Sequence, residues 1–174
     1  MQRNPTPPTT DEPDEVTAGW LFATANALGL SDADLAYVLD VREDTLRKAW
    51  KYGNVTIPDG VRVDLEQFIQ FTDSCVDVLT ERAESVQDPA IVVYQRLRDV
   101  PPNHLAATYG VTWWDHVAFS VSRKVPELYL GTLAEVAAAY DYRPETVDTM
   151  HTDPAMIALY SGRDAPVRTR VRAS

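Results

Sequence analysis

The sequence predicts a mostly α-helical protein that carries a helix-turn-helix motif near its N-terminus. Along most of the chain, apolar residues recur at steps of three and four, which is the spacing of a buried helix face. Only residues 91–94 form a convincing strand, because they are apolar and largely β-branched. Residues 29–53 combine two short amphipathic segments with a tight turn between them, which is the plan of a helix-turn-helix.

The composition is that of a soluble globular protein. The chain has 174 residues, of which 45% are hydrophobic and 24% are charged, so it can bury the core of one domain or of two small ones. Its apolar runs are too short to cross a bilayer and no secretory signal opens it, so we expect a cytoplasmic protein without a membrane partner. The single cysteine, Cys75, excludes an internal disulfide and lies on an apolar helix face, which favours a core role.

The net charge of −10 argues against a nucleic-acid partner unless the charges are segregated, because phosphates repel an acidic protein. Carboxylates crowd residues 11–15, whereas basic residues gather at two places. The first basic cluster, around the second helix of the motif, consists of Arg42, Arg47, Lys48 and Lys51. The second, in the C-terminal tail, consists of Arg163, Arg168, Arg170 and Arg172. This segregation is compatible with specific DNA binding and also with no DNA binding.

The N-terminal section begins with residues 1–14, a proline-rich acidic stretch that we expect to be a disordered tail. A helix is predicted over residues 15–28, with one face made of Val16, Trp20, Ala23 and Ala27. Gly29 suits the position that follows a helix C-terminus. Ser31 is expected to cap the next helix, and Asp34 can close a capping box with it.

The two helices of the motif are expected to pack on each other through apolar side chains. The inner face of the first helix consists of Leu35, Ala36 and Leu39. Val41 fills the turn, and Leu46 and Trp50, four residues apart, pack the second helix back onto the first. The alternative is a generic pair of amphipathic helices, which any small helical domain contains.

Residues 60–84 predict a long helix with a heptad-like apolar seam. The seam consists of Val61, Leu65, Phe68, Thr72, Cys75 and Leu79. It can pack on the preceding helices or pair with the same helix of a second subunit. The strand at residues 91–94 needs a partner, because a lone strand is unstable in water, and the same strand of a second chain is the simplest candidate.

Two more helices are expected before residue 130. The first is short and covers residues 104–109. The second is expected to begin with Thr112 as its N-cap and to end before Pro126. Its apolar face consists of Trp113, Val117 and Val121.

A faint internal repeat relates residues 34–46 to residues 135–147, with apolar positions matching throughout. Thr132 and Glu135 repeat the capping box. The repeat predicts a second helix-turn-helix within residues 131–162, with a generic helical hairpin as the equal alternative.

Two acidic side chains on the second helix of this motif, Glu145 and Asp148, argue against DNA recognition by it. Only Arg143 and the Arg-rich tail could supply phosphate contacts there. We therefore divide the chain into a tail, a helix-turn-helix domain with its long fourth helix, a strand-plus-helix segment for dimerisation or an accessory role, a possible second motif and a basic tail. Their bounds are 1–14, 15–86, 87–130, 131–162 and 163–174.

The sequence lacks the motifs that carry catalysis or bind cofactors and metals. The seven glycines are dispersed, so no glycine-rich loop can cradle a phosphate, and no Gly-x-Ser-x-Gly elbow occurs. His104, His116 and His151 lie far apart, without neighbouring ligands at metal spacing. We expect no enzyme activity, no cofactor and no metal site.

Residues 30–53 resemble the helix-turn-helix regulators of the lambda-repressor-like (XRE) family. Compared with the usual family turn, this chain has one extra position between Val41 and Trp50. That insertion and the run of residues 50–61 look similar to the branch of anti-CRISPR-associated autorepressors. The resemblance covers about residues 15–130, and the layout with a second motif is similar to phage immunity repressors that carry two DNA-binding heads.

The resemblance implies a lambda-repressor-like helix-turn-helix bundle, a small strand-plus-helix segment and a C-terminal helical section. It places residues 43–51 in the major groove. Arg47 and Lys48 are then expected to contact bases or phosphates, and an arginine suits the paired acceptors of guanine. Thr45 is expected to touch a thymine methyl group or a phosphate.

Other residues of the motif are expected to hold the DNA backbone. These are Arg42 and Lys51 at the two ends of the second helix, Asn54, and Ser31, whose helix N-terminus would face a phosphate. Because relatives dimerise through the middle section, we expect a homodimer interface there. Its predicted residues are Val92, Tyr94 and Trp114.

Four acidic residues depart from the family pattern. Asp32 and Asp34 stand at the start of the first helix, where relatives have neutral residues near DNA. Glu43 and Asp44 stand at the head of the second, where we expect repulsion from the DNA backbone, although Asp44 could accept from a cytosine amine. These departures weaken the expectation of tight binding but leave the fold unaffected.

The expected function is therefore that of a sequence-specific transcriptional repressor, autoregulatory or of phage or mobile-element origin. Its expected partner is operator DNA. The protein would bind it as a homodimer, or as a monomer if the second motif also binds DNA. The alternative is a protein-binding module, such as an antitoxin or a phage protein that binds a host factor through its acidic surface.

Overall fold

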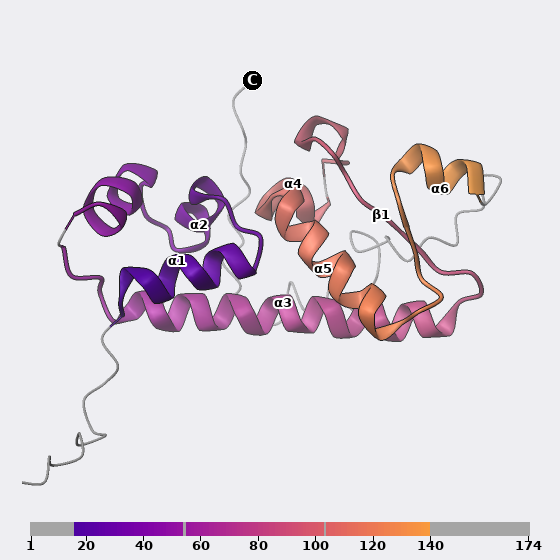
Figure 1. Ribbon diagram of the computed structural model, residues 1–174, viewed down its shortest axis with the longest axis horizontal. Helices are drawn as coiled ribbons and strands as arrows, with labels where there is room; N and C mark the ends of the chain where they lie inside the picture. The colour runs from indigo at the N-terminus through magenta and orange to yellow at the C-terminus, as the bar shows by residue number, and fades with distance from the viewer. Residues whose placement is uncertain (1–15, 54, 103, 140–174) are drawn as a thin grey trace, which may run out of the picture.

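One long helix, α3 (Gly60–Ser85), forms the base of the molecule, and the remaining elements lie along one side of it (Figure 1). The structure is a computed structural model, and it describes residues 16–53, 55–102 and 104–139. Before α3 come α1 (Ala18–Ala27), α2 (Asp32–Val38) and η1 (Thr45–Lys51). After it come β1 (Ala90–Val92), η2 (Leu97–Asp99), α4 (Leu105–Tyr109), α5 (Val111–Lys124), β2 (Tyr129–Gly131) and α6 (Leu133–Ala139). The prediction of a mostly helical protein is confirmed.

The apolar seam of α3 is buried along its whole length, as its heptad spacing predicts. It packs against elements of the same chain, chiefly α5, rather than being left open for a second subunit. Burial raises the pKa of the Cys75 thiol to about 12, so this side chain behaves as a small core residue. A single apolar stripe therefore assembles both halves of the fold.

Helix α1 forms where it was predicted, but its predicted face is buried only in part: Val16 is buried and Trp20 packs against the core, whereas the two alanines do not. Thr17 caps the helix by accepting from the backbone N–H of Trp20 at 3.1 Å. Leu21 and Ala25 are buried in the core, whereas Ala23 and Ala27 are exposed. Both choices have helical spacing, and the face that carries a leucine buries more apolar area than one with alanines at both positions.

Helix α5 begins two residues earlier than expected, because Gly110 rather than Thr112 is its N-cap residue. Gly110 has φ +102°, a conformation that other residues rarely adopt, and it turns the chain sharply from α4 into α5. The predicted apolar face is buried as expected. Within it, the indole N–H of Trp113 donates to Thr72 Oγ1 at 3.1 Å, which anchors α5 on α3.

The strand near residue 91 pairs within its own chain, which corrects the prediction that a second chain supplies its partner. Strand β1 lies parallel to β2, with Ala90 opposite Tyr129 and Val92 opposite Gly131. A parallel pair needs a long crossover, and helices α4 and α5 supply it. The indole N–H of Trp114 on α5 donates to the Val92 carbonyl at 2.8 Å and ties the crossover to the sheet.

The hydrophobic core is continuous from Val16 to Val136 and crosses the expected boundary near residue 86. After β2, Glu135 accepts from the backbone N–H of Thr132 at 2.7 Å, so the second capping box forms as predicted and starts α6. The rest of the proposed second motif, residues 140–162, lies outside the described residues. In the part that is described, no helix is long and apolar enough to cross a membrane.

Candidate nucleic-acid interface

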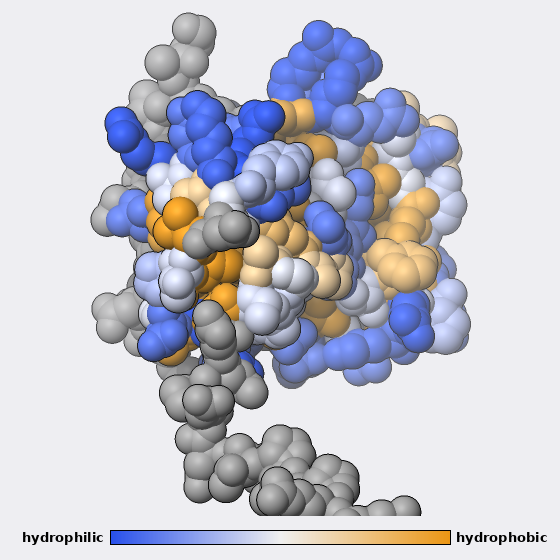
Figure 2. Space-filling view, turned by 60° about the vertical axis from the view of Figure 1, so that its left-hand side comes forward, coloured by the Kyte–Doolittle hydropathy of each residue, from blue (hydrophilic) through white to orange (hydrophobic). Residues whose placement is uncertain are grey.

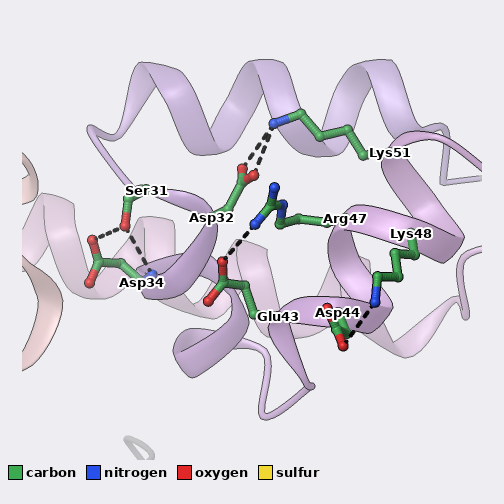
Figure 3. A network of polar contacts seen from close by, with 8 residues as sticks. All are labelled: Ser31, Asp32, Asp34, Glu43, Asp44, Arg47, Lys48 and Lys51. Carbon is green, nitrogen blue, oxygen red and sulfur yellow. Dashed lines mark hydrogen bonds and ion pairs between the residues drawn. The ribbon is translucent and has the colours of Figure 1, made fainter.

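Helix α2 begins with the capping box that the sequence predicts. Ser31 Oγ accepts from the backbone N–H of Asp34 at 3.2 Å, and its hydroxyl donates to the carboxylate of Asp34 (Figure 3). In the usual box, the acid would accept from the backbone N–H of the cap residue instead. The difference keeps the Asp34 carboxylate folded against the helix start.

The turn after α2 is closed by a left-handed residue, Asp40, which has φ +53°. The backbone N–H of Val41 donates to the Ala36 carbonyl at 2.9 Å, six residues closing into one loop. This geometry ends α2 and sends the chain across it into a second helix. Glycine would adopt the conformation of Asp40 without strain.

That second helix covers residues 43–51, as predicted, and most of it is η1, a π-helix whose hydrogen bonds reach five residues ahead. We call the whole segment the 43–51 helix. Leu46 and Trp50 are buried against the rest of the chain, whereas Arg47 and Lys48 are exposed. A π-helix holds one residue more per hydrogen-bonded turn than an α-helix, which would accommodate the extra position between Val41 and Trp50.

The two outward cations of the 43–51 helix each lie beside a carboxylate of the same helix (Figure 3). Arg47 Nη1 is 3.5 Å from Glu43 Oε1, and Lys48 Nζ is 3.2 Å from Asp44 Oδ2. All four side chains are half exposed or more. Each of these two exposed cations therefore has a carboxylate beside it, which lowers the net positive charge on the outward side of this helix.

Lys51, expected to hold the DNA backbone, pairs with Asp32 across two helices at 3.0 Å. Its ammonium also lies 5.1 Å from the centre of the Phe22 ring on α1. This side chain thereby ties the end of the 43–51 helix to the start of α2. A phosphate at the start of α2, as predicted beside Ser31, would have to share this place with Asp32.

Asp34 does not face outward, contrary to the expectation that it lies near DNA. Its side chain is buried and lies against Gly110, at the N-terminus of α5. The positive end of α5 suits a carboxylate at this place. The charge of Asp34 is thus engaged in helix packing, and only one acid at the start of α2, Asp32, remains near the surface.

The remaining predicted DNA contacts divide into two groups. Arg42 is exposed just before the 43–51 helix and Thr45 is half-buried within it. The others lie outside the described residues: Asn54, Arg143, Arg168, Arg170 and Arg172.

The predicted dimer interface needs a correction. Val92, Tyr94 and Trp114 are all buried in the core of a single chain. Trp114 is fully buried and its one polar group is bonded to β1, so it has no surface to offer a second subunit. Sequence alone cannot separate an interface tryptophan from a core one, since both follow the same apolar periodicity.

Sequence reasoning missed two exposed apolar side chains next to the 43–51 helix. Tyr52 is 78% exposed and Val55 is 57% exposed, just beyond the end of the helix. Figure 2 shows this end of the molecule, with hydrophilic side chains along its upper edge and apolar ones reaching the surface below them. In the sequence, only the position of Tyr52 and Val55 shortly after Lys51 indicates that they lie beside the motif.

The described residues hold no group of three or more His, Cys, Asp or Glu side chains that could bind a metal ion. His104 has a structural role. Its Nδ1 caps α4 by accepting from the backbone N–H of Ala106 at 3.0 Å, and its ring packs edge-on against Trp114 at 4.5 Å. Comparison of the chain with family models, with curated proteins and with solved structures gave no match.

Proposed function

We propose that the protein binds duplex DNA in a sequence-specific manner, with α2 and the 43–51 helix as a helix-turn-helix and the 43–51 helix in the major groove. One observation carries the proposal: this helix buries Leu46 and Trp50 on one side and presents Arg47 and Lys48 on the other. A recognition helix needs the same division between a packed side and a polar side. Bound to an operator, the protein would act as a transcriptional repressor.

The exposed cations fit different parts of a duplex. The planar guanidinium of Arg47 can donate to the two neighbouring acceptors of guanine, O6 and N7. Arg42, exposed just before the 43–51 helix, would meet a phosphate and fix the orientation of the helix. Lys51 could reach the backbone only by leaving Asp32.

A binding titration with matched variants tests this proposal. Duplexes recovered from a random pool are titrated with the full chain, with R47A/K48A, and with R123A/K124A. The control pair removes the same two residue types from the exposed end of α5. We expect R47A/K48A to lose about 100-fold or more in affinity, the sum of one base contact and one phosphate contact, and the control to stay within about threefold. Circular dichroism should be the same for all three.

The symmetry of the recovered duplex reports the assembly on DNA. A homodimer with one helix-turn-helix per chain selects a two-fold symmetric site. A monomer that also uses residues 131–162 selects an asymmetric one. Equal affinity of R47A/K48A and the wild-type chain would contradict the role of the 43–51 helix.

The numbers of acidic and basic residues around the motif favour a second candidate function, binding of a basic protein. Residues 31–51 carry five carboxylates and four cations, so the surface that should attract phosphates is not basic. A partner rich in lysine or arginine would be attracted by the same surface. The two candidates are separated by a direct titration of the chain with a lysine-rich peptide in the absence of DNA, because tight binding of the peptide is expected only in the second.

A further inference from the structure

Two carboxylates occupy the side of the 43–51 helix that the proposed function turns toward DNA. Glu43 pairs with Arg47 and Asp44 pairs with Lys48, at 3.5 Å and 3.2 Å. In both pairs the acid stands four residues before the base, which is the favourable orientation along a helix. Figure 3 shows both acids pointing toward their cations from the preceding turn.

Helix stability gives only a small reason for these acids. Exposed ion pairs of this kind contribute little to folding, because water screens them and two long side chains lose freedom. Lys48 and Asp44 are each 76% exposed, so this pair is close to fully hydrated. The larger consequence is electrostatic: each acid cancels a charge that non-specific DNA binding depends on.

When one of these ion pairs opens on DNA, the new partners of its two side chains depend on whether they meet a phosphate or a base pair. A phosphate replaces the partner of the cation, but the carboxylate is then left facing another anion. The major-groove edge of a G·C pair offers both replacements, since guanine presents O6 and N7 as acceptors and cytosine presents its N4 amine as a donor. A G·C pair can therefore supply a new partner to both the cation and the carboxylate, whereas a phosphate can supply one only to the cation.

We propose that Glu43 and Asp44 are specificity determinants, which disfavour binding of Arg47 and Lys48 to phosphates and favour G·C pairs in the recognised site. This inference rests on the proposed function. It also accounts for acids at the head of a recognition helix, where repulsion alone would only weaken binding. Asp32 and Asp34 do not belong to these two pairs: Asp32 joins Lys51 to the start of α2, and Asp34 is buried against α5.

Neutral isosteres test the proposal against a control with the same loss of charge. E43Q/D44N is compared with D73N/E81Q, which removes one aspartate and one glutamate from exposed positions of α3. The affinity of each full chain is measured for a random-sequence duplex and for the duplex that the wild-type chain selects. We expect E43Q/D44N to bind the random duplex about tenfold more tightly than wild type, and D73N/E81Q to stay within about twofold.

The selected duplex supplies the second readout. E43Q/D44N should gain less on it than on random DNA, so its preference for the selected site falls, and selection with this variant should recover fewer G·C pairs. The single variants E43Q and D44N each keep one ion pair and should show about half of the effect on a logarithmic scale.

Two results would overturn the inference, and they are distinguishable. If the wild-type chain selects a site but both double variants change random binding equally, the acids act only through net charge and the proposed function stands. If no chain binds any duplex, the inference and the proposed function fail together. Thermal unfolding of each variant confirms that the helix is retained.

Discussion

The carboxylate of Asp34 on α2 lies directly against Gly110 at the start of α5: a β-carbon at position 110 would stand 2.7 Å from Asp34 Oδ2. A second close approach lies beside it, because a β-carbon on Gly29 would stand 2.4 Å from the Thr112 carbonyl oxygen. The first turn of α5 therefore packs against both ends of the α1–α2 connection. The two glycines let residues 29–34 pack closely against the start of α5.

Substitution of Gly110 by alanine should destabilise the whole fold. The added β-carbon meets the Asp34 carboxylate, and φ +102° is strained for alanine, so we expect a loss of about 2–4 kcal/mol in the free energy of unfolding. Gly60→Ala is the matched control, because no atom lies within 4 Å of its β-carbon position and alanine favours a helix. Urea unfolding measures both variants, and equal stability of the two would contradict the packing of Asp34 on Gly110.

The left-handed turn at Asp40 should respond to backbone freedom more than to charge. Asp40→Gly and Asp40→Ala both remove the carboxylate, so their difference reports the conformation with φ +53°. We expect the glycine variant to be more stable than the alanine variant by about 1 kcal/mol. Thermal unfolding of the pair measures this difference, and the opposite order would show that the turn does not hold this conformation in solution.

Thr72 should be needed for its hydroxyl, although it lies in an apolar seam. It accepts from the indole N–H of Trp113 and donates to the Phe68 carbonyl at 2.9 Å. Thr72→Val keeps the shape but leaves a buried N–H without an acceptor, which should cost about 1–3 kcal/mol in unfolding free energy. Thr72→Ser keeps the acceptor and should lose only about 1 kcal/mol for the missing methyl group. A valine variant as stable as the serine variant would exclude this bond.

Glu135 should stabilise α6 only when it is ionised. Hydrogen bonds from the backbone N–H and then the hydroxyl of Thr132 lower the pKa of this carboxyl below its ordinary value of 4.5. Because the folded pKa is lowered, its contribution is present above the unfolded pKa and is lost as the pH falls through the folded one. An NMR titration of Glu135 should show a midpoint below 4.5. Thr132→Ala should raise that midpoint without restoring the ordinary value, since the backbone donor remains.

Local chemistry was enough to predict much of this fold. The seam of α3 and the capping boxes at Ser31 and Thr132 depend on residues that recur three or four positions apart along one helix. Such spacings can be recognised in the sequence without knowledge of the tertiary contacts. The outward position of Arg47 follows in the same way from the burial of Leu46 and Trp50.

The features that were missed depend on contacts between distant segments. Strand β2 has three residues and no periodicity of its own, so only its pairing with β1 makes it a strand. The ion pair between Lys51 and Asp32 and the burial of Asp34 under α5 also arise from tertiary packing. The same packing decides that Trp114 belongs to the core rather than to an interface.

Selection from a random duplex pool, at about 0.15 M salt, is the most direct test of the central claim that the 43–51 helix reads DNA. The wild-type chain and R47A/K48A are carried through the same rounds. We expect the wild-type chain to enrich a defined sequence that contains G·C pairs and R47A/K48A to enrich none. Enrichment of the same sequence by both proteins, or of no sequence by either, would contradict DNA recognition by the 43–51 helix.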